Sequence, residues 1–73
     1  MAKKGSGTVY RVTEVIGTSA MSWEDAAKNA VAAASKTLRD LRIAEISKLD
    51  MKVEDGKVVA YRARILLSFK YDA

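Results

Sequence analysis

Residues 57–71 read KVVAYRARILLSFKY, and this stretch decides the fold. One row of alternate residues is apolar throughout and comprises Val59, Tyr61, Ala63, Ile65, Leu67, Phe69 and Tyr71. The residues between them are mixed in character and include Arg62 and Arg64. Because successive side chains of a strand point to opposite faces, this pattern predicts a strand with one buried face. Such a strand belongs in the middle of a sheet, beneath a helix.

The preceding segment supplies a second strand and the turn that joins the two. Its predicted range is residues 43–54, with Ile43, Leu49, Met51 and Val53 on one face and Ala44, Ile46 and several charged residues on the other. Asp55 and Gly56 indicate a tight hairpin turn, because glycine accepts the positive φ that such a turn requires. We therefore interpret the acidic residues Glu54 and Asp55 as part of the turn and not as a metal site.

A helix is predicted over residues 23–39, where apolar residues recur at intervals of three and four. Ser22 can cap its first free amides, and Glu24 and Asp25 place negative charge at the positive end of the helix dipole. The buried stripe of this helix is mostly alanine, so the helix is expected to lie close to the sheet.

The first strand is expected over residues 8–16, which are rich in β-branched side chains, with residues 17–19 ending it. The order is then β-α-β-β, with the long third strand between the other two. This predicts an α+β fold in which a three-stranded, antiparallel-type sheet of order 1-3-2 packs on one helix. Residues 1–7 are interpreted as a flexible leader and residues 8–71 as a single domain.

One copy of this fold is marginal in size. A domain of 73 residues buries only about 60% of the surface that its unfolded chain exposes. The chain contains neither Cys nor His, which excludes disulfides and the usual zinc sites as a remedy. One helix covers one face of the sheet, and the other face carries apolar residues among its charges. We therefore expect self-association rather than a solvated face.

Residues suited to catalysis are few. Without His or Cys no base exists for a nucleophilic triad, and the carboxylates show no calcium-loop spacing. We therefore expect no enzymatic activity. Glu14 and Glu45 lie within apolar strands, where a charge needs a partner. Ion pairs with Arg62 or Arg64 are expected there in preference to a metal. Trp23 is expected to be a packing anchor.

The net charge of +4 is compatible with an ordinary polar surface or with an anionic partner. The aromatic residues of 57–71 are expected to face the helix, which disfavours base stacking and hence a nucleic-acid partner. No apolar run approaches the roughly 20 residues of a membrane span, and residues 1–6 do not resemble a signal peptide. A cytoplasmic location without a membrane partner is expected.

Several short motifs together resemble those of the dodecin family. They are VIGTS at residues 15–19, SWEDAA at 22–27, KTLR at 36–39 and LSFK at 67–70. The resemblance spans roughly residues 8–70. It implies a hollow homododecamer built from trimers, and many family members sequester flavin to store it or to quench its photochemistry.

The resemblance also implies site residues. In flavin-binding members a Trp early in the second strand stacks on the isoalloxazine ring, and a Gln of the third strand binds its edge. In an ungapped alignment the Trp falls on Ile43, the aromatic that follows it on Ala44, and the Gln on Arg62. Stacking of about 0.5–1.5 kcal/mol per ring pair is then lost, so flavin binding is expected to be weak or absent. Our candidate ligand-binding residues are Ile43, Glu45 and Arg62, with no catalytic residue and no assigned metal ligand.

The sequence as a whole, including Ser22, Trp23 and Glu24, is more similar to a flavin-independent branch of the family that is associated with calcium. Calcium prefers oxygen ligands, which carboxylates from several subunits can supply. The leading prediction is a non-enzymatic shell that binds or sequesters a small ligand or cation, with copies of itself as its main partner. The alternatives are a purely structural assembly and a basic nucleic-acid-binding module.

Overall fold

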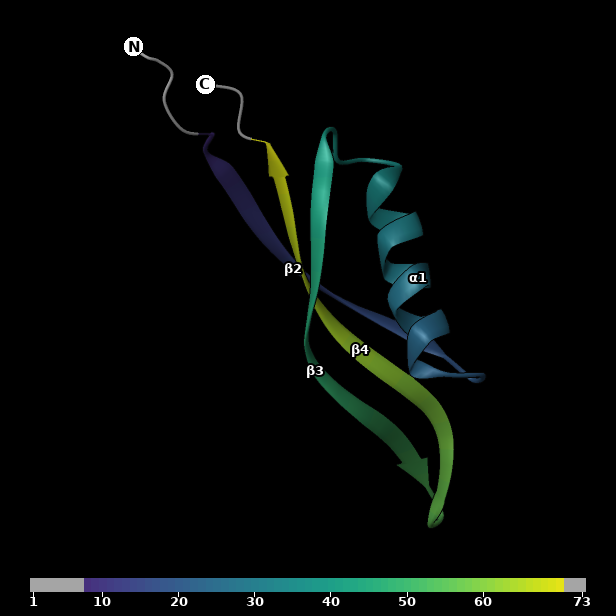
Figure 1. The fold of residues 1–73 in the computed structure, drawn as a ribbon. Helices are drawn as coiled ribbons and strands as arrows, with labels where there is room; N and C mark the ends of the chain where they lie inside the picture. The colour runs from purple at the N-terminus through teal and green to yellow at the C-terminus, as the bar shows by residue number, and fades with distance from the viewer. Residues whose placement is uncertain (1–7, 71–73) are drawn as a thin grey trace.

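The computed structural model describes residues 8–70, which form one three-stranded sheet with a helix packed against it (Figure 1). The elements are β2 (Tyr10–Ser19), α1 (Trp23–Ser35), β3 (Leu41–Glu54) and β4 (Lys57–Lys70). The sheet order is β2-β4-β3, and both outer strands run antiparallel to β4. The predicted fold class and strand order are confirmed. The predicted leader at residues 1–7 and the end of the third strand at Tyr71 lie outside the described residues.

The core lies between the helix and the central strand. Its buried side chains are Ala26, Ala30 and Ala34 from α1 and Ala63, Ile65 and Leu67 from β4. This confirms the apolar row predicted for the third strand in its central part. None of the described helices is long and apolar enough to cross a membrane.

The first strand begins two residues later than predicted, at Tyr10, and ends three residues later, because Gly17 continues it rather than ending it. Gly17 pairs with Ala63, and β2 runs on to Ser19. A Cβ atom added at Gly17 would overlap the carbonyl oxygen of Ala26 and lie 2.8 Å from the Cβ of Ala30. The glycine is therefore the point where the helix crosses the strand at close range, and the predicted strand end at residues 17–19 is wrong.

The helix starts where predicted and ends four residues earlier. The Ser22 side chain accepts a hydrogen bond from the Asp25 amide at 3.0 Å, which confirms the predicted cap. After Ser35 the amides of Thr37 and Leu38 both donate to the carbonyl of Ala34, so the chain leaves the helix through a turn. Leu38 still packs against the core from this turn. The apolar spacing therefore extends past the helix itself.

A β-bulge interrupts the alternation of the second strand. Its register against β4 shifts between Ile46 and Lys48, which leaves Ser47 as the additional residue. The Ser47 hydroxyl donates to the carbonyl of Arg64 at 3.2 Å. An additional residue of this kind exchanges the two faces of the strand beyond it.

The bulge corrects the predicted faces of this strand. The register pairs Ile46 with Ile65, Leu49 with Ala63 and Ile43 with Ser68. Directly opposed residues of an antiparallel pair point to the same face. Ile46 and Leu49 therefore face the helix side, whereas Ile43 faces away. The prediction that Ile43 and Leu49 share a face is wrong, because the bulge lies between them.

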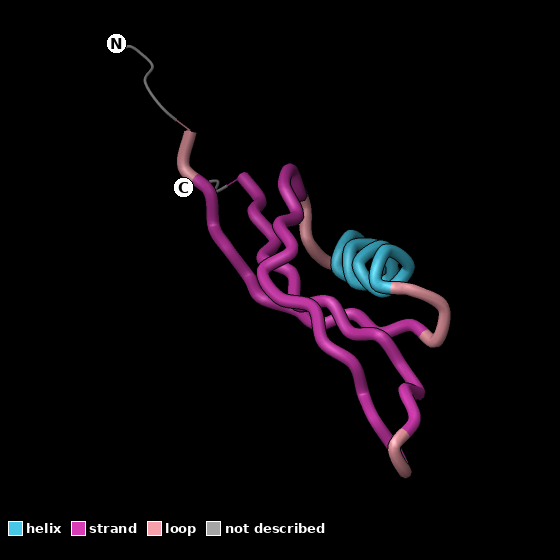
Figure 2. The backbone as a smooth tube through the Cα atoms, turned by 60° about the horizontal axis from the view of Figure 1, so that its bottom comes forward, coloured by secondary structure: helices cyan, strands magenta, loops and turns pink. Residues whose placement is uncertain are grey.

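The β3–β4 hairpin extends well beyond the helix, as Figures 1 and 2 show. Its turn has φ values of 52° at Asp55 and 76° at Gly56, which confirms the predicted two-residue turn. Near the tip, Val53 and Val58 are 58% and 47% exposed. This end of the sheet has no cover from the described part of its own chain.

Candidate ligand site on the uncovered face of the sheet

The three predicted ligand residues lie on the face of the sheet that the helix leaves uncovered, because they share a face with the β4 residues that alternate with its buried row. Ile43 is paired with Ser68, Glu45 with Leu66, and Arg62 alternates with the buried residues of β4. We call this surface the open face. It includes Val12, Glu14, Ile16, Thr18, Ile43, Glu45, Lys48, Asp50, Arg62, Arg64, Leu66 and Ser68. Glu45 and Arg62 are separated along it by the length of β4 between Leu66 and Arg62.

Arg62 is held by Asp50, which lies directly opposite it on β3. The Arg62 Nε donates to Asp50 Oδ1 at 2.7 Å, and Nη2 donates to Oδ2 at 2.8 Å. Two parallel bonds of this kind are the strongest form of an arginine–carboxylate contact. The hydrogen bond from Arg62 is the main cause of a lowered pKa at Asp50, and the charges of Arg62 and Arg64 add to it. Asp50 in turn raises the pKa of Arg62.

The glutamates of the open face differ in their partners. The Glu14 carboxylate lies 3.7 Å from Nη1 of Arg64, which confirms the predicted ion pair for this residue. Within residues 8–70, Glu45 makes no ion pair, so the same prediction is wrong for Glu45 in this part of the chain. Glu45 is accordingly a carboxylate of the open face that these residues leave without a cation.

Trp23 anchors the start of the helix to the hairpin. Its Nε1 donates to the backbone carbonyl of Asp50 at 2.9 Å. Its ring meets Tyr61 edge to face, with centroids 5.0 Å apart and an interplanar angle of 67°. The predicted packing role of Trp23 is confirmed. The indole thereby also fixes the backbone of Asp50, whose side chain binds Arg62.

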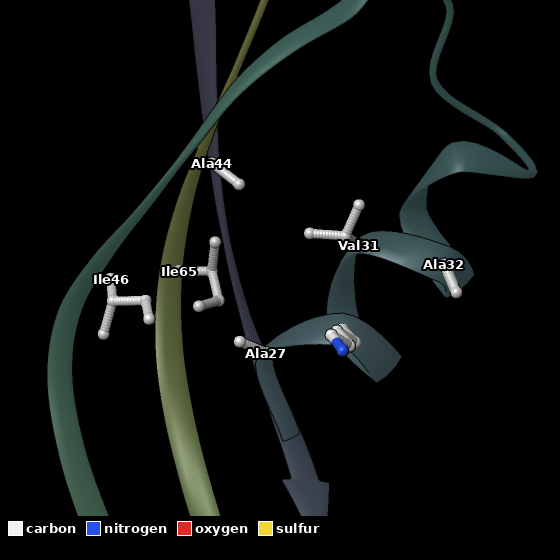
Figure 3. A pocket seen from close by; sticks show the side chains of 7 residues that line it. Ala27, Val31, Ala32, Ala44, Ile46 and Ile65 are labelled. Atoms are coloured by element: carbon white, nitrogen blue, oxygen red, sulfur yellow. The ribbon is translucent and has the colours of Figure 1, made fainter. Parts of the chain in front are cut away.

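An apolar groove of about 340 Å³ lies between α1 and β3 on the helix side (Figure 3). The helix packs mainly on β2 and β4, which leaves β3 apart from it. The groove is lined by Ala27, Lys28, Val31, Ala32, Ala44, Ile46 and Ile65. In Figure 3 the side chains of Val31 and Ala44 point toward each other across this space. The groove offers apolar contact and only one charged side chain.

A single chain does not assemble a metal site in its described part. Among residues 8–70 no three Asp or Glu side chains gather closely enough to hold a metal ion. Asp50 and Glu14 are each engaged by an arginine of β4. Any cation site that uses these residues therefore needs ligands from a second copy.

The subunit has β-α-β-β order and one uncovered face that carries apolar residues and ion pairs. These features are typical of small proteins that self-associate to cover such a face. Residues 9–72 match the Dodecin family model. The chain belongs to the dodecin family. Dodecamer assembly is known for this fold, and dodecins are known as non-catalytic ligand-binding proteins.

Individual relatives agree with this assignment. Calcium dodecin of Mycobacterium tuberculosis is 41% identical over 63 residues, which cover 86% of this chain and 89% of that protein. The structure of dodecin from Streptomyces coelicolor has a TM-score of 0.86 at 39% identity, covering 94% of this chain and 99% of that one. The crystal structure of M. tuberculosis calcium dodecin, described as calcium-chelating with a novel calcium-binding site, has a TM-score of 0.78 at 42% identity and covers 89% and 93%. The resemblance to calcium-associated dodecins is confirmed.

Proposed function

We propose that this protein is a non-enzymatic cytoplasmic dodecin shell, built from twelve copies arranged as trimers, that sequesters a small ligand or a divalent cation. The proposed unit is a single domain over residues 8–71. The observation that carries the proposal is the open face, where Val12, Ile16 and Ile43 are 59%, 46% and 53% exposed beside paired charges. Large apolar side chains exposed on one face of a sheet are typical of an interaction surface. Copies of the same chain are the proposed cover.

The groove on the helix side and the hairpin tip support the same proposal. Ile46, which lines the groove, is 50% exposed although it pairs with a buried residue of β4. Met51 and Val59 in the hairpin arm are 46% and 41% exposed. A domain of this size has little stability in reserve, so leaving this much apolar surface in water is costly. Association buries it.

Calcium is the proposed cation. Glu45 supplies a carboxylate on the open face that is not neutralised within residues 8–70, and a relative with 41% identity is a calcium dodecin. Calcium takes six to eight oxygen ligands, so one Glu45 cannot hold it alone. The remaining oxygen ligands are proposed to come from Glu45 residues of other copies. Ile43 and Arg62 have no side-chain oxygen, so they are proposed as residues that bind a small ligand on this face and not as calcium ligands.

Calorimetric titration of the assembled protein with calcium, before and after chelation, tests the cation proposal. We expect a binding heat that chelation abolishes and that Glu45→Gln removes. Glu54→Gln is the matched control, since Glu54 lies on the same strand and pairs with Lys52 at 3.4 Å. Its binding heat should equal that of the wild type. The absence of heat at millimolar calcium would remove calcium from the proposal.

Flavin is not proposed as a ligand. In the ungapped alignment the stacking Trp of flavin-binding members falls on Ile43, whose aliphatic side chain offers no ring face. The purified protein is therefore expected to be colourless. Absorbance in the flavin bands of the protein as purified would contradict this expectation directly.

A purely structural assembly is the second candidate, because both arginines of the open face are engaged by carboxylates of the same chain. Under this reading the shell binds no specific ligand. A nucleic-acid-binding role has less support, since Tyr61 packs on Trp23 and is not presented for base stacking. Calcium titration separates the structural reading from the main proposal.

A further inference from the structure

The contact between Asp50 and Arg62 has the geometry of a bound oxyanion. We propose that Arg62 is an anion-binding residue whose ligand position is filled by the chain's own Asp50 carboxylate, so that a phosphate or carboxylate ligand must displace Asp50 to bind. The inference rests on the proposed function, because it concerns which ligands the open face of the shell accepts.

The hydrogen bonds of Arg62 match those that a guanidinium makes to an oxyanion. Arg62 uses Nε and Nη2, the two donors of one edge of the guanidinium, at 2.7 and 2.8 Å. This edge fits any group with two oxygens at carboxylate or phosphate spacing. Asp50 supplies such a pair of oxygens from within the chain. A ligand oxyanion would use the same two donors, so the two are mutually exclusive.

Exposure makes this exchange feasible. The side chains of Arg62 and Asp50 are 38% and 52% exposed in the single chain. Ion pairs exposed to this degree contribute little to folding stability, because water solvates the separated charges well. Within one subunit, a ligand that replaces the Asp50 carboxylate therefore does not have to disrupt a buried network.

The surroundings of the Asp50 carboxylate also suit an anion. Arg64 lies two residues along the same face of β4, and its charge helps to lower the pKa of Asp50. Arg64 is itself held by Glu14 at 3.7 Å, a longer contact than those of Arg62. The positive charges of Arg62 and Arg64 thus both favour an anion where the Asp50 carboxylate lies. Glu14 is paired with Arg64 and therefore offsets the charge of that arginine only.

The backbone of Asp50 is fixed independently of its side chain. Trp23 donates its indole N–H to the Asp50 carbonyl at 2.9 Å, and the residue is paired within the β3–β4 ladder. Rotation of the Asp50 side chain is therefore enough to release Arg62. The strand does not have to move, so displacement is a local event on the open face.

Calorimetric titration with inorganic phosphate and, separately, with acetate tests the proposal on the full-length chain at low ionic strength. We expect Asp50→Asn to bind one of these anions about tenfold more tightly than the wild type, because the charged donors of Arg62 are released. The anion with the gain identifies the head group as a phosphate or a carboxylate. Adding Arg62→Gln to Asp50→Asn should remove the gain.

Glu54→Gln is the control for net charge, since it removes one negative charge from the same strand without touching Arg62. Its anion affinity should equal that of the wild type. Asp50→Ser is the second variant if Asn lowers the yield of folded protein. No gain for either anion, a gain that survives Arg62→Gln, or an equal gain in Glu54→Gln would each overturn the proposal.

The outcome is separable from that of the proposed function. Particle mass is measured for every variant by light scattering. A shell of unchanged mass in which Asp50→Asn gains no anion affinity refutes the displacement of Asp50 alone. A wild type that remains a single folded chain refutes the shell, whatever its affinity for phosphate.

Discussion

The two faces of β4 differ in how fully the rest of the chain covers them. Ala63, Ile65 and Leu67 point to the helix and are fully buried by it. Arg62, Arg64 and Leu66 alternate with them in the same strand and remain partly exposed. The first row is buried within one chain. The second row stays partly exposed, and its two arginines form ion pairs with Asp50 and Glu14. One strand therefore carries both the fold of the subunit and the surface for its neighbours.

Packing on the helix side depends on how closely α1 approaches the sheet and not on large side chains. Three of its six buried apolar side chains are helix alanines, which contribute little apolar area. The helix reaches the sheet only because Gly17 has no side chain. The open face has the opposite character, with larger side chains and less contact within the chain.

The largest expected effect is the difference between two adjacent leucines that lie on opposite faces of β4. Leu67→Ala should lower the free energy of unfolding by about 2–5 kcal/mol, because Leu67 is fully buried beneath the helix. Urea denaturation at fixed protein concentration measures this. Leu66→Ala removes the same atoms from the open face and should cost less, while reducing the particle mass. Equal costs with unchanged mass in both variants would mean that the two faces do not differ in role.

A second variant tests the close approach at the helix side. Gly17→Ala should cost about 1–3 kcal/mol, since the new Cβ would overlap the Ala26 carbonyl oxygen and force the helix outward. Thr18→Ala is the control, because Thr18 is exposed on the open face of the same strand. Thermal denaturation compares the two. If Gly17→Ala lowers the melting temperature no more than Thr18→Ala does, α1 does not contact the strand at Gly17.

The sequence pattern was sufficient to predict the order of the elements and the buried row of β4. A row of alternate apolar residues and an Asp55–Gly56 turn are local signals, and each was confirmed. The role of Gly17 was not predictable in the same way, because a strand break and a close approach by a helix both call for glycine. Only the position of α1 distinguishes them.

The partner of Arg62 was missed for a related reason. Simple pairing outward from the Asp55–Gly56 turn places Leu49 opposite Arg62. The register shift between Lys52 and Val53 moves Asp50 into that position instead. Bulges depend on packing and twist more than on local residue type, so their positions could not be predicted from one sequence. The ligand roles of Ile43, Glu45 and Arg62 stay predictions.

The smallest expected effect concerns the pH dependence of the Asp50–Arg62 pair. The folded chain lowers the pKa of Asp50, chiefly through the hydrogen bond from Arg62. Its contribution to stability should be complete above the ordinary aspartate pKa of about 3.9 and decline as the pH falls through the lowered value. Urea midpoints of the wild type and Asp50→Asn should therefore differ near neutral pH and converge in acid. A gap that widens on acidification would contradict this sign.

Copies of the same chain are proposed to cover the open face. Multi-angle light scattering on the wild type at micromolar concentration is the decisive measurement of this cover. We expect one species of about 96 kDa, which is twelve times the 8.0 kDa of a single chain. A stable, folded particle of about 8 kDa under the same conditions would contradict it.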